Sequence, residues 1–85
     1  MKNKVLVNIN IPEIDLEFDM YLPLNKKIST VLILIDKAIS QTHKRTYFLT
    51  KKSLLMDYEN GTKYDGESLV KDTDIKNGSK LIILP

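Results

Sequence analysis

Two segments near the start of the chain, 4–11 and 15–22, alternate apolar and polar residues. A period of two is typical of half-buried β-strands, and Pro12-Glu13-Ile14 separates the segments, so we expect an antiparallel pair. The second strand carries acidic side chains between its apolar ones, as exposed sheet edges often do, because charge there discourages pairing with another chain. The alternating apolar positions are Val5, Val7, Ile9, Ile11, Leu16, Phe18, Met20 and Leu22.

A helical period replaces this alternation in the next part of the chain. It predicts a helix from about Thr30 to Thr42, capped by Ser29 or Thr30, with one apolar stripe facing the sheet. Ile33 falls among the polar positions on the far side, and an exposed aliphatic residue of this kind is either incidental or a partner contact. The stripe comprises Ile28, Val31, Leu32, Ile35, Ala38, Ile39 and Thr42.

The last third of the chain contains a turn signal and a closing apolar strand. Asn60-Gly61 lies between the strand-like runs 54–58 and 63–65, and this dipeptide is the strongest short-range signal for a hairpin. The final run, 80–84, reads as a strand. Residues 45–52 fit a strand, an irregular link or a short second helix.

This order of elements predicts an α+β fold. Two strands, one long helix and two or three further strands give a mixed four- to five-stranded sheet with the helix packed on one face. The 85 residues form a single domain, 1–85, because no repeat, low-complexity tract or linker divides them.

Composition argues against catalysis. The chain has no cysteine, which excludes disulfides, thiolate metal sites and cysteine nucleophiles and fits a reducing cytoplasm. His43 is the only histidine, and we expect it at the surface near the end of the helix. The carboxylates of residues 65, 67, 72 and 74 lack the spacing of a calcium loop, and no glycine-rich phosphate loop occurs. We therefore expect no catalytic residue, no cofactor and no metal.

Charge and hydropathy limit the partners. The net charge is +2, with thirteen basic and eleven acidic residues spread along the chain, which is too weak a bias to imply nucleic acid. Nucleic-acid binding through Lys44, Arg45, Lys51 and Lys52 stays a minor hypothesis that would require salt-dependent binding. No apolar run is long enough to span a membrane, so we expect membrane association only through a partner.

The whole chain resembles the β-grasp fold of ubiquitin. The likeness is clearest in Tyr64-Asp65-Gly66-Glu67-Ser68-Leu69, in Asp74-Ile75 and in the run 77–84. Within that superfamily the chain is similar to the small YukD/EsaB-type proteins of Gram-positive type VII secretion systems, through segments 22–28 and 75–84.

This resemblance implies a non-catalytic cytoplasmic adaptor that contacts protein partners, namely membrane components of the secretion machinery or its ATPase. The alternative is a generic β-grasp interaction module of another pathway, self-associating as a weak homodimer through its sheet. Conjugating modifiers of the ubiquitin family continue into a tail that ends in two glycines, whereas this sequence ends at Leu84-Pro85. We therefore expect no covalent conjugation.

Strand alternation also predicts an apolar patch on the sheet face that the helix leaves open. If the odd-numbered residues of the first and last strands face the helix, the even-numbered ones face out. For residues 54–57 we expect the opposite phase, with Leu54 and Met56 inward. Residues 45–52 could instead fold over this face as core. The candidate partner-binding residues are Leu6, Leu55, Ile82 and Leu84, together with Ile33 on the helix.

Overall fold

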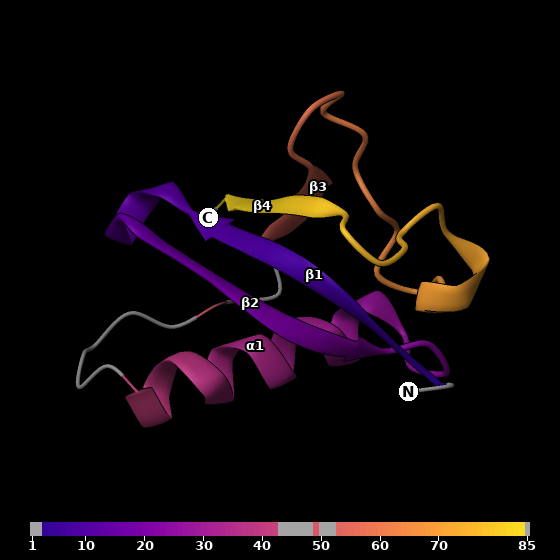
Figure 1. The fold of residues 1–85 in the computed structure, drawn as a ribbon, viewed down its shortest axis with the longest axis horizontal. Helices are drawn as coiled ribbons and strands as arrows, with labels where there is room; N and C mark the ends of the chain where they lie inside the picture. Colours follow the sequence, from indigo (N-terminus) through magenta and orange to yellow (C-terminus); the bar gives the residue numbers. More distant parts are fainter. Residues whose placement is uncertain (1–2, 43–48, 50–52, 85) are drawn as a thin grey trace.

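The structure, a computed structural model, describes residues 3–42, 49 and 53–84 as four strands and one long helix (Figure 1). The expected α+β class with a mixed sheet is confirmed. His43, the basic residues 44, 45, 51 and 52, and most of segment 45–52 lie outside the described residues. The elements are β1 (Lys4–Ile11), β2 (Leu16–Pro23), α1 (Ile28–Thr42), β3 (Leu54–Asp57) and β4 (Lys80–Leu84), with short 3-10 turns at Pro12–Ile14 and Val70–Asp72.

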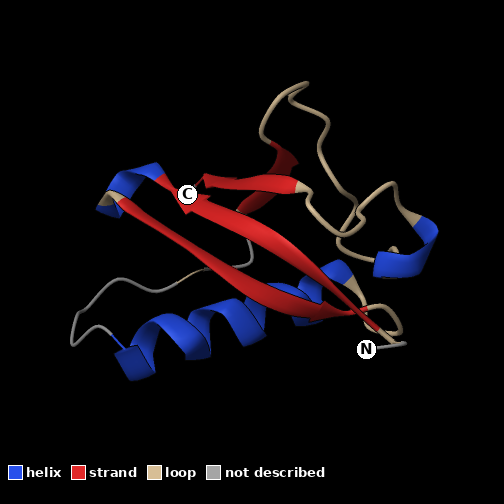
Figure 2. Ribbon diagram, in the orientation of Figure 1, coloured by secondary structure: helices blue, strands red, loops and turns tan. Residues whose placement is uncertain are grey.

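The sheet has the strand order β2-β1-β4-β3 (Figure 2). β1 pairs antiparallel with β2 along its whole length and parallel with β4, where Asn8 lies opposite Lys80 and Asn10 opposite Ile82. β3 pairs antiparallel with β4. The first and last strands are therefore the central neighbours, and β2 and β3 form the two edges.

The core lies between the sheet and α1. The helix contributes its stripe every three or four residues, as its period predicts, and each strand contributes alternate side chains. The buried residues among them are at most 8% exposed, whereas Leu16, Phe18 and Met20 of β2 are half-buried. The buried hydrophobic residues are Val5, Val7, Ile9, Ile11, Leu22, Ile28, Val31, Ile35, Ile39, Leu55, Val70, Ile75, Leu81 and Ile83.

The helix begins at Ile28, two residues before the predicted start at Thr30. Its first amides have backbone acceptors from a distant part of the chain: Ile28 N donates to the carbonyl oxygen of Ser68 (2.9 Å), and Ser29 N donates to that of Gly66 (3.0 Å). The segment around residues 66–68 thus supplies acceptors that local sequence cannot reveal.

The Asn60-Gly61 turn forms, but the strand expected after it does not. Gly61 has φ +73°, and the Asp57 carboxylate accepts hydrogen bonds from the amides of Glu59 (2.8 Å) and Asn60 (3.0 Å). Beyond the turn, Lys63 makes only an isolated bridge with Met56. The chain then departs from β3 to bring residues 66–68 to the helix start.

The phase predicted for β3 is wrong. Leu55 is 1% exposed and lies in the core, whereas Leu54 is 37% exposed and points to the open side. Opposing residues of an antiparallel pair share a face, and Leu55 lies opposite Ile83, which is also buried. Leu55 therefore does not belong to the open face.

Candidate protein-interaction surface

Four apolar side chains gather on the open face of the sheet, the face turned away from α1. The register places Leu54 opposite Leu84 and Met56 opposite Ile82, so the four form two adjacent cross-strand pairs. Leu54 is exposed, and the other three are half-buried. We call Leu54, Met56, Ile82 and Leu84 the β3–β4 patch.

Leu6 faces the same side but lies away from this patch. The parallel register aligns Ile82 with Asn10, four residues further along β1 than Leu6, a separation of about 13 Å. Leu6, 39% exposed, lies opposite Tyr21. Together with Lys4, Asn77 and Gly78 the pair lines a hollow of about 300 Å³.

A polar stripe separates the two apolar groups. The Asn10 side-chain amide donates to Asn8 Oδ1 (2.7 Å) and to the carbonyl oxygen of Leu81 (3.1 Å), and the Asn8 amide donates to Asp19 Oδ1 (2.9 Å). The Lys80 ammonium lies 4.4 Å from the centre of the Tyr58 ring, a cation–π contact. These side chains hold one another in place, which gives the apolar patch a polar border.

The structure thus brings together two of the five candidate residues, Ile82 and Leu84. Leu55 is buried in the core, and its neighbour Leu54 lies in the patch instead. Leu6 lines a separate hollow. Ile33 is 57% exposed on α1, as its place on the helical wheel predicts. The sequence analysis missed Leu54 and Met56, which only the pairing register of β3 with β4 assigns to the open face.

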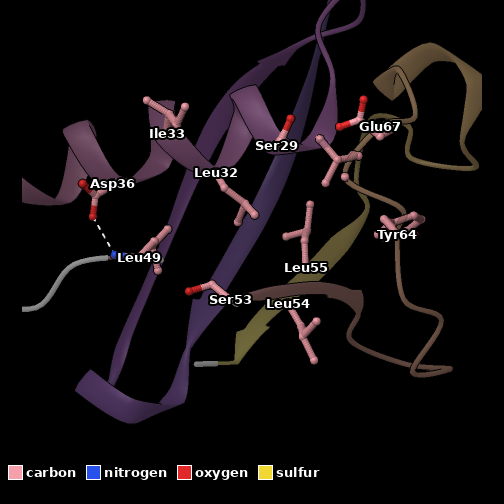
Figure 3. Close-up of a pocket in the computed structure, with 12 residues that line it drawn as sticks. Ser29, Leu32, Ile33, Asp36, Leu49, Ser53, Leu54, Leu55, Tyr64 and Glu67 are labelled. Atoms are coloured by element: carbon pink, nitrogen blue, oxygen red, sulfur yellow. Dashed lines mark hydrogen bonds between the residues drawn. The ribbon is translucent and has the colours of Figure 1, made fainter. Parts of the chain in front are cut away.

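A groove of about 710 Å³ lies between α1 and β3 (Figure 3). Ile33 and Leu32 from the helix, and Leu54 and Tyr64 from the other side, contribute to its mostly apolar lining. The Asp36 carboxylate accepts a hydrogen bond from the Leu49 amide (2.8 Å). Because Leu54 lines the groove and also belongs to the β3–β4 patch, the two surfaces meet at this residue.

Tyr64 is the group in the described residues with a clearly altered pKa. Burial raises the pKa of the Tyr64 phenol well above its ordinary value, and the hydrogen bond that its hydroxyl donates to Asp74 Oδ1 (2.8 Å) and the negative charge of that carboxylate raise it further. The native state therefore holds the phenol proton at pH values where a free tyrosine loses it.

Substitution Tyr64→Phe is expected to reduce the alkaline sensitivity of the fold. Above pH about 10 the unfolded chain loses the phenol proton and the native state keeps it, so stability falls as pH rises, whereas below that pH the contribution is constant. Urea unfolding of wild type and Tyr64→Phe at pH 9 and pH 11 measures the effect. An equal loss of stability in the two proteins would contradict this assignment.

Within residues 3–42, 49 and 53–84, no group of three or more histidine or acidic side chains could hold a metal ion. The carboxylates around the last turns have local structural roles instead. Glu67 pairs with Lys27 (3.0 Å), and Asp65 accepts a hydrogen bond from the Glu67 amide (2.9 Å). No helix in the described part of the chain is long and apolar enough to cross a membrane.

No protein-family model matches this sequence, and no curated protein matches it. Solved structures do match. The EccD5 ubiquitin-like domain from Mycobacterium xenopi has a TM-score of 0.66 at 16% identity, covering 95% of this chain and 92% of that domain. The fold is the ubiquitin-like β-grasp.

Two further matches show how widely this β-grasp fold occurs. A chain of the MycP5-free ESX-5 inner membrane complex has a TM-score of 0.69 at 15% identity, with 96% of this chain aligned to 21% of that much longer one. A chain of a toluene 4-monooxygenase complex has a TM-score of 0.71 at 9% identity, covering 94% and 95%. Likenesses at such identities establish the fold alone.

Proposed function

We propose that this ubiquitin-like protein is a non-catalytic adaptor of a type VII secretion system, of the YukD/EsaB type, acting through non-covalent protein contacts. The observation that supports this most is the β3–β4 patch, an apolar surface on a fold shared with the EccD5 domain and with part of an ESX-5 membrane complex. Its partner would be a membrane component or the ATPase of the secretion machinery, reached from the cytoplasm.

The geometry of the patch suits a partner-binding centre. Protein interfaces combine an apolar core with a polar rim and bury about 800 Å² on each partner, far more than four side chains supply. The patch would therefore form the core of the contact. Lys80, Tyr58 and the asparagines of β1 would form its rim.

Deletion of the gene in its source organism is expected to stop export of the small secreted helical proteins that such systems carry. An adaptor that joins machine components is needed for assembly or activity even though it performs no chemistry. The measurement is the amount of these proteins in culture supernatant, with wild-type complementation as the control. Unchanged export would remove the secretion assignment and leave a generic β-grasp interaction module.

A further inference from the structure

The outer edge of β2 carries backbone groups that the described structure leaves unpaired. Asn8 N donates to the carbonyl oxygen of Ser79 (2.9 Å), and the Leu6 carbonyl oxygen accepts from Gly78 N (2.8 Å), so the even-numbered residues of β1 direct their backbone groups away from β2. The odd-numbered residues of β1 therefore bond to β2, opposite Phe18, Met20 and Leu22.

It follows that the intervening residues of β2, namely Glu17, Asp19 and Tyr21, direct their amides and carbonyls outward. Within the described residues, none of these backbone groups has a protein partner. Three residues with free N–H and C=O groups form a short ladder that ends at Pro23, which has no N–H to donate.

The other edge of the sheet differs. On β3 the Leu55 carbonyl oxygen accepts a hydrogen bond from Tyr64 N (3.0 Å), and Asp57 N donates to the Thr62 carbonyl oxygen (2.9 Å), so the returning chain covers that edge. Of the two edges, only β2 offers a ladder of several unpaired groups within the described part of the chain.

The side chains of β2 are sorted by face. Glu17 and Asp19 lie on the open face and are exposed, whereas Leu16, Phe18 and Met20 lie on the helix side, where they are half-buried and pack against the core. A strand added here would therefore have carboxylates beside one of its faces and partly exposed apolar side chains beside the other.

A second copy of this chain fits the edge poorly. An antiparallel pair of β2 strands centred on Asp19 would put two Asp19 carboxylates directly opposite each other, and a pair centred on Glu17 would do the same with glutamates. Like charges in opposing positions destabilise a sheet. The same carboxylates would stabilise an incoming strand that places lysine or arginine opposite them.

We propose that the edge of β2 binds an extended segment of a partner protein in which basic and apolar residues alternate, adding a fifth strand to the sheet. Backbone hydrogen bonds to Glu17, Asp19 and Tyr21 would hold the segment. Its basic side chains would face the two carboxylates, and its apolar side chains would extend the surface beside Phe18 and Met20. This surface is separate from the β3–β4 patch.

A synthetic ten-residue peptide that alternates lysine with valine and isoleucine tests the proposal by fluorescence anisotropy. It should bind at least tenfold more tightly than a peptide of the same composition with the lysines grouped at one end. Glu17→Gln combined with Asp19→Asn should weaken binding about three- to tenfold, since two exposed ion pairs are lost. The matched control, Glu59→Gln with Asp72→Asn, removes two exposed carboxylates elsewhere and should leave binding unchanged.

Two further measurements separate strand addition from simple charge attraction. Binding of the peptide should slow hydrogen exchange at the amides of Glu17, Asp19 and Tyr21. Tyr21→Pro should abolish peptide binding whereas Tyr21→Ala should not, because only proline removes the outward N–H. Equal affinity for the two peptides, or no slowing of exchange at these amides, would overturn the proposal. Ile82→Asp alters the β3–β4 patch, on which the proposed function depends, and should leave peptide binding to β2 unchanged. The two proposals can therefore fail separately.

Discussion

Leu55→Ala is expected to lower the free energy of unfolding by about 2–5 kcal/mol, whereas Leu54→Ala should lower it by less than about 1 kcal/mol. The two leucines are adjacent in the chain, and the two substitutions remove the same atoms. Leu55 is 1% exposed and packs in the core, so its truncation leaves a cavity, while Leu54 is 37% exposed and loses only surface contacts. Urea unfolding of the two variants beside wild type measures the difference.

This pair of substitutions is informative because each variant controls for the other. The two changes have the same effect on local β-propensity, so a difference between them reports which side chain faces the helix. Unchanged slopes of free energy against urea would confirm that the two unfolding reactions are comparable. If Leu54→Ala were the more destabilising, β3 would have the opposite phase and the β3–β4 patch would not exist.

Ile82→Asp is expected to abolish export in a deletion strain complemented with the variant. The Ile82 side chain lies opposite Met56 in the β3–β4 patch. A carboxylate at this position would have to lose its hydrating water when a partner binds. Loss of a central apolar anchor costs about 2 kcal/mol or more of binding energy, roughly 30-fold in affinity.

The matched control is Ser40→Asp, which adds the same negative charge at an exposed position of α1, away from the β3–β4 patch and outside the groove lining. Export should persist with this variant. Circular dichroism and urea unfolding would establish that the two proteins are folded. Export that survives Ile82→Asp, or fails equally with Ser40→Asp, would contradict the assignment of the patch as the partner surface.

Regular patterns in the sequence predicted the correct elements. The strict alternation over β1 and β2 identified their buried faces, and the spacing of Ile28, Val31, Ile35 and Ile39 identified the buried stripe of α1. In these segments only one face can be buried without burying charge, so the pattern has a single solution.

The errors arose where neighbouring positions are alike or where the determinant is distant. Residues 54–56 are all apolar, so alternation could not tell Leu54 from Leu55, and the phase came from pairing with β4. The helix start depends on acceptors about forty residues away. The separation of Leu6 from Ile82 depends on the stagger of β1 against β4, which no local pattern contains.

The central claim is that the β3–β4 patch contacts the secretion machinery, and site-specific photo-cross-linking in the source organism tests it most directly. A benzophenone amino acid would replace Leu54 in one strain and Lys71, an exposed residue away from the sheet, in another. We predict an adduct with a membrane component or the ATPase of the machinery from position 54 and none from position 71. No adduct from position 54 in cells that export normally would contradict the claim.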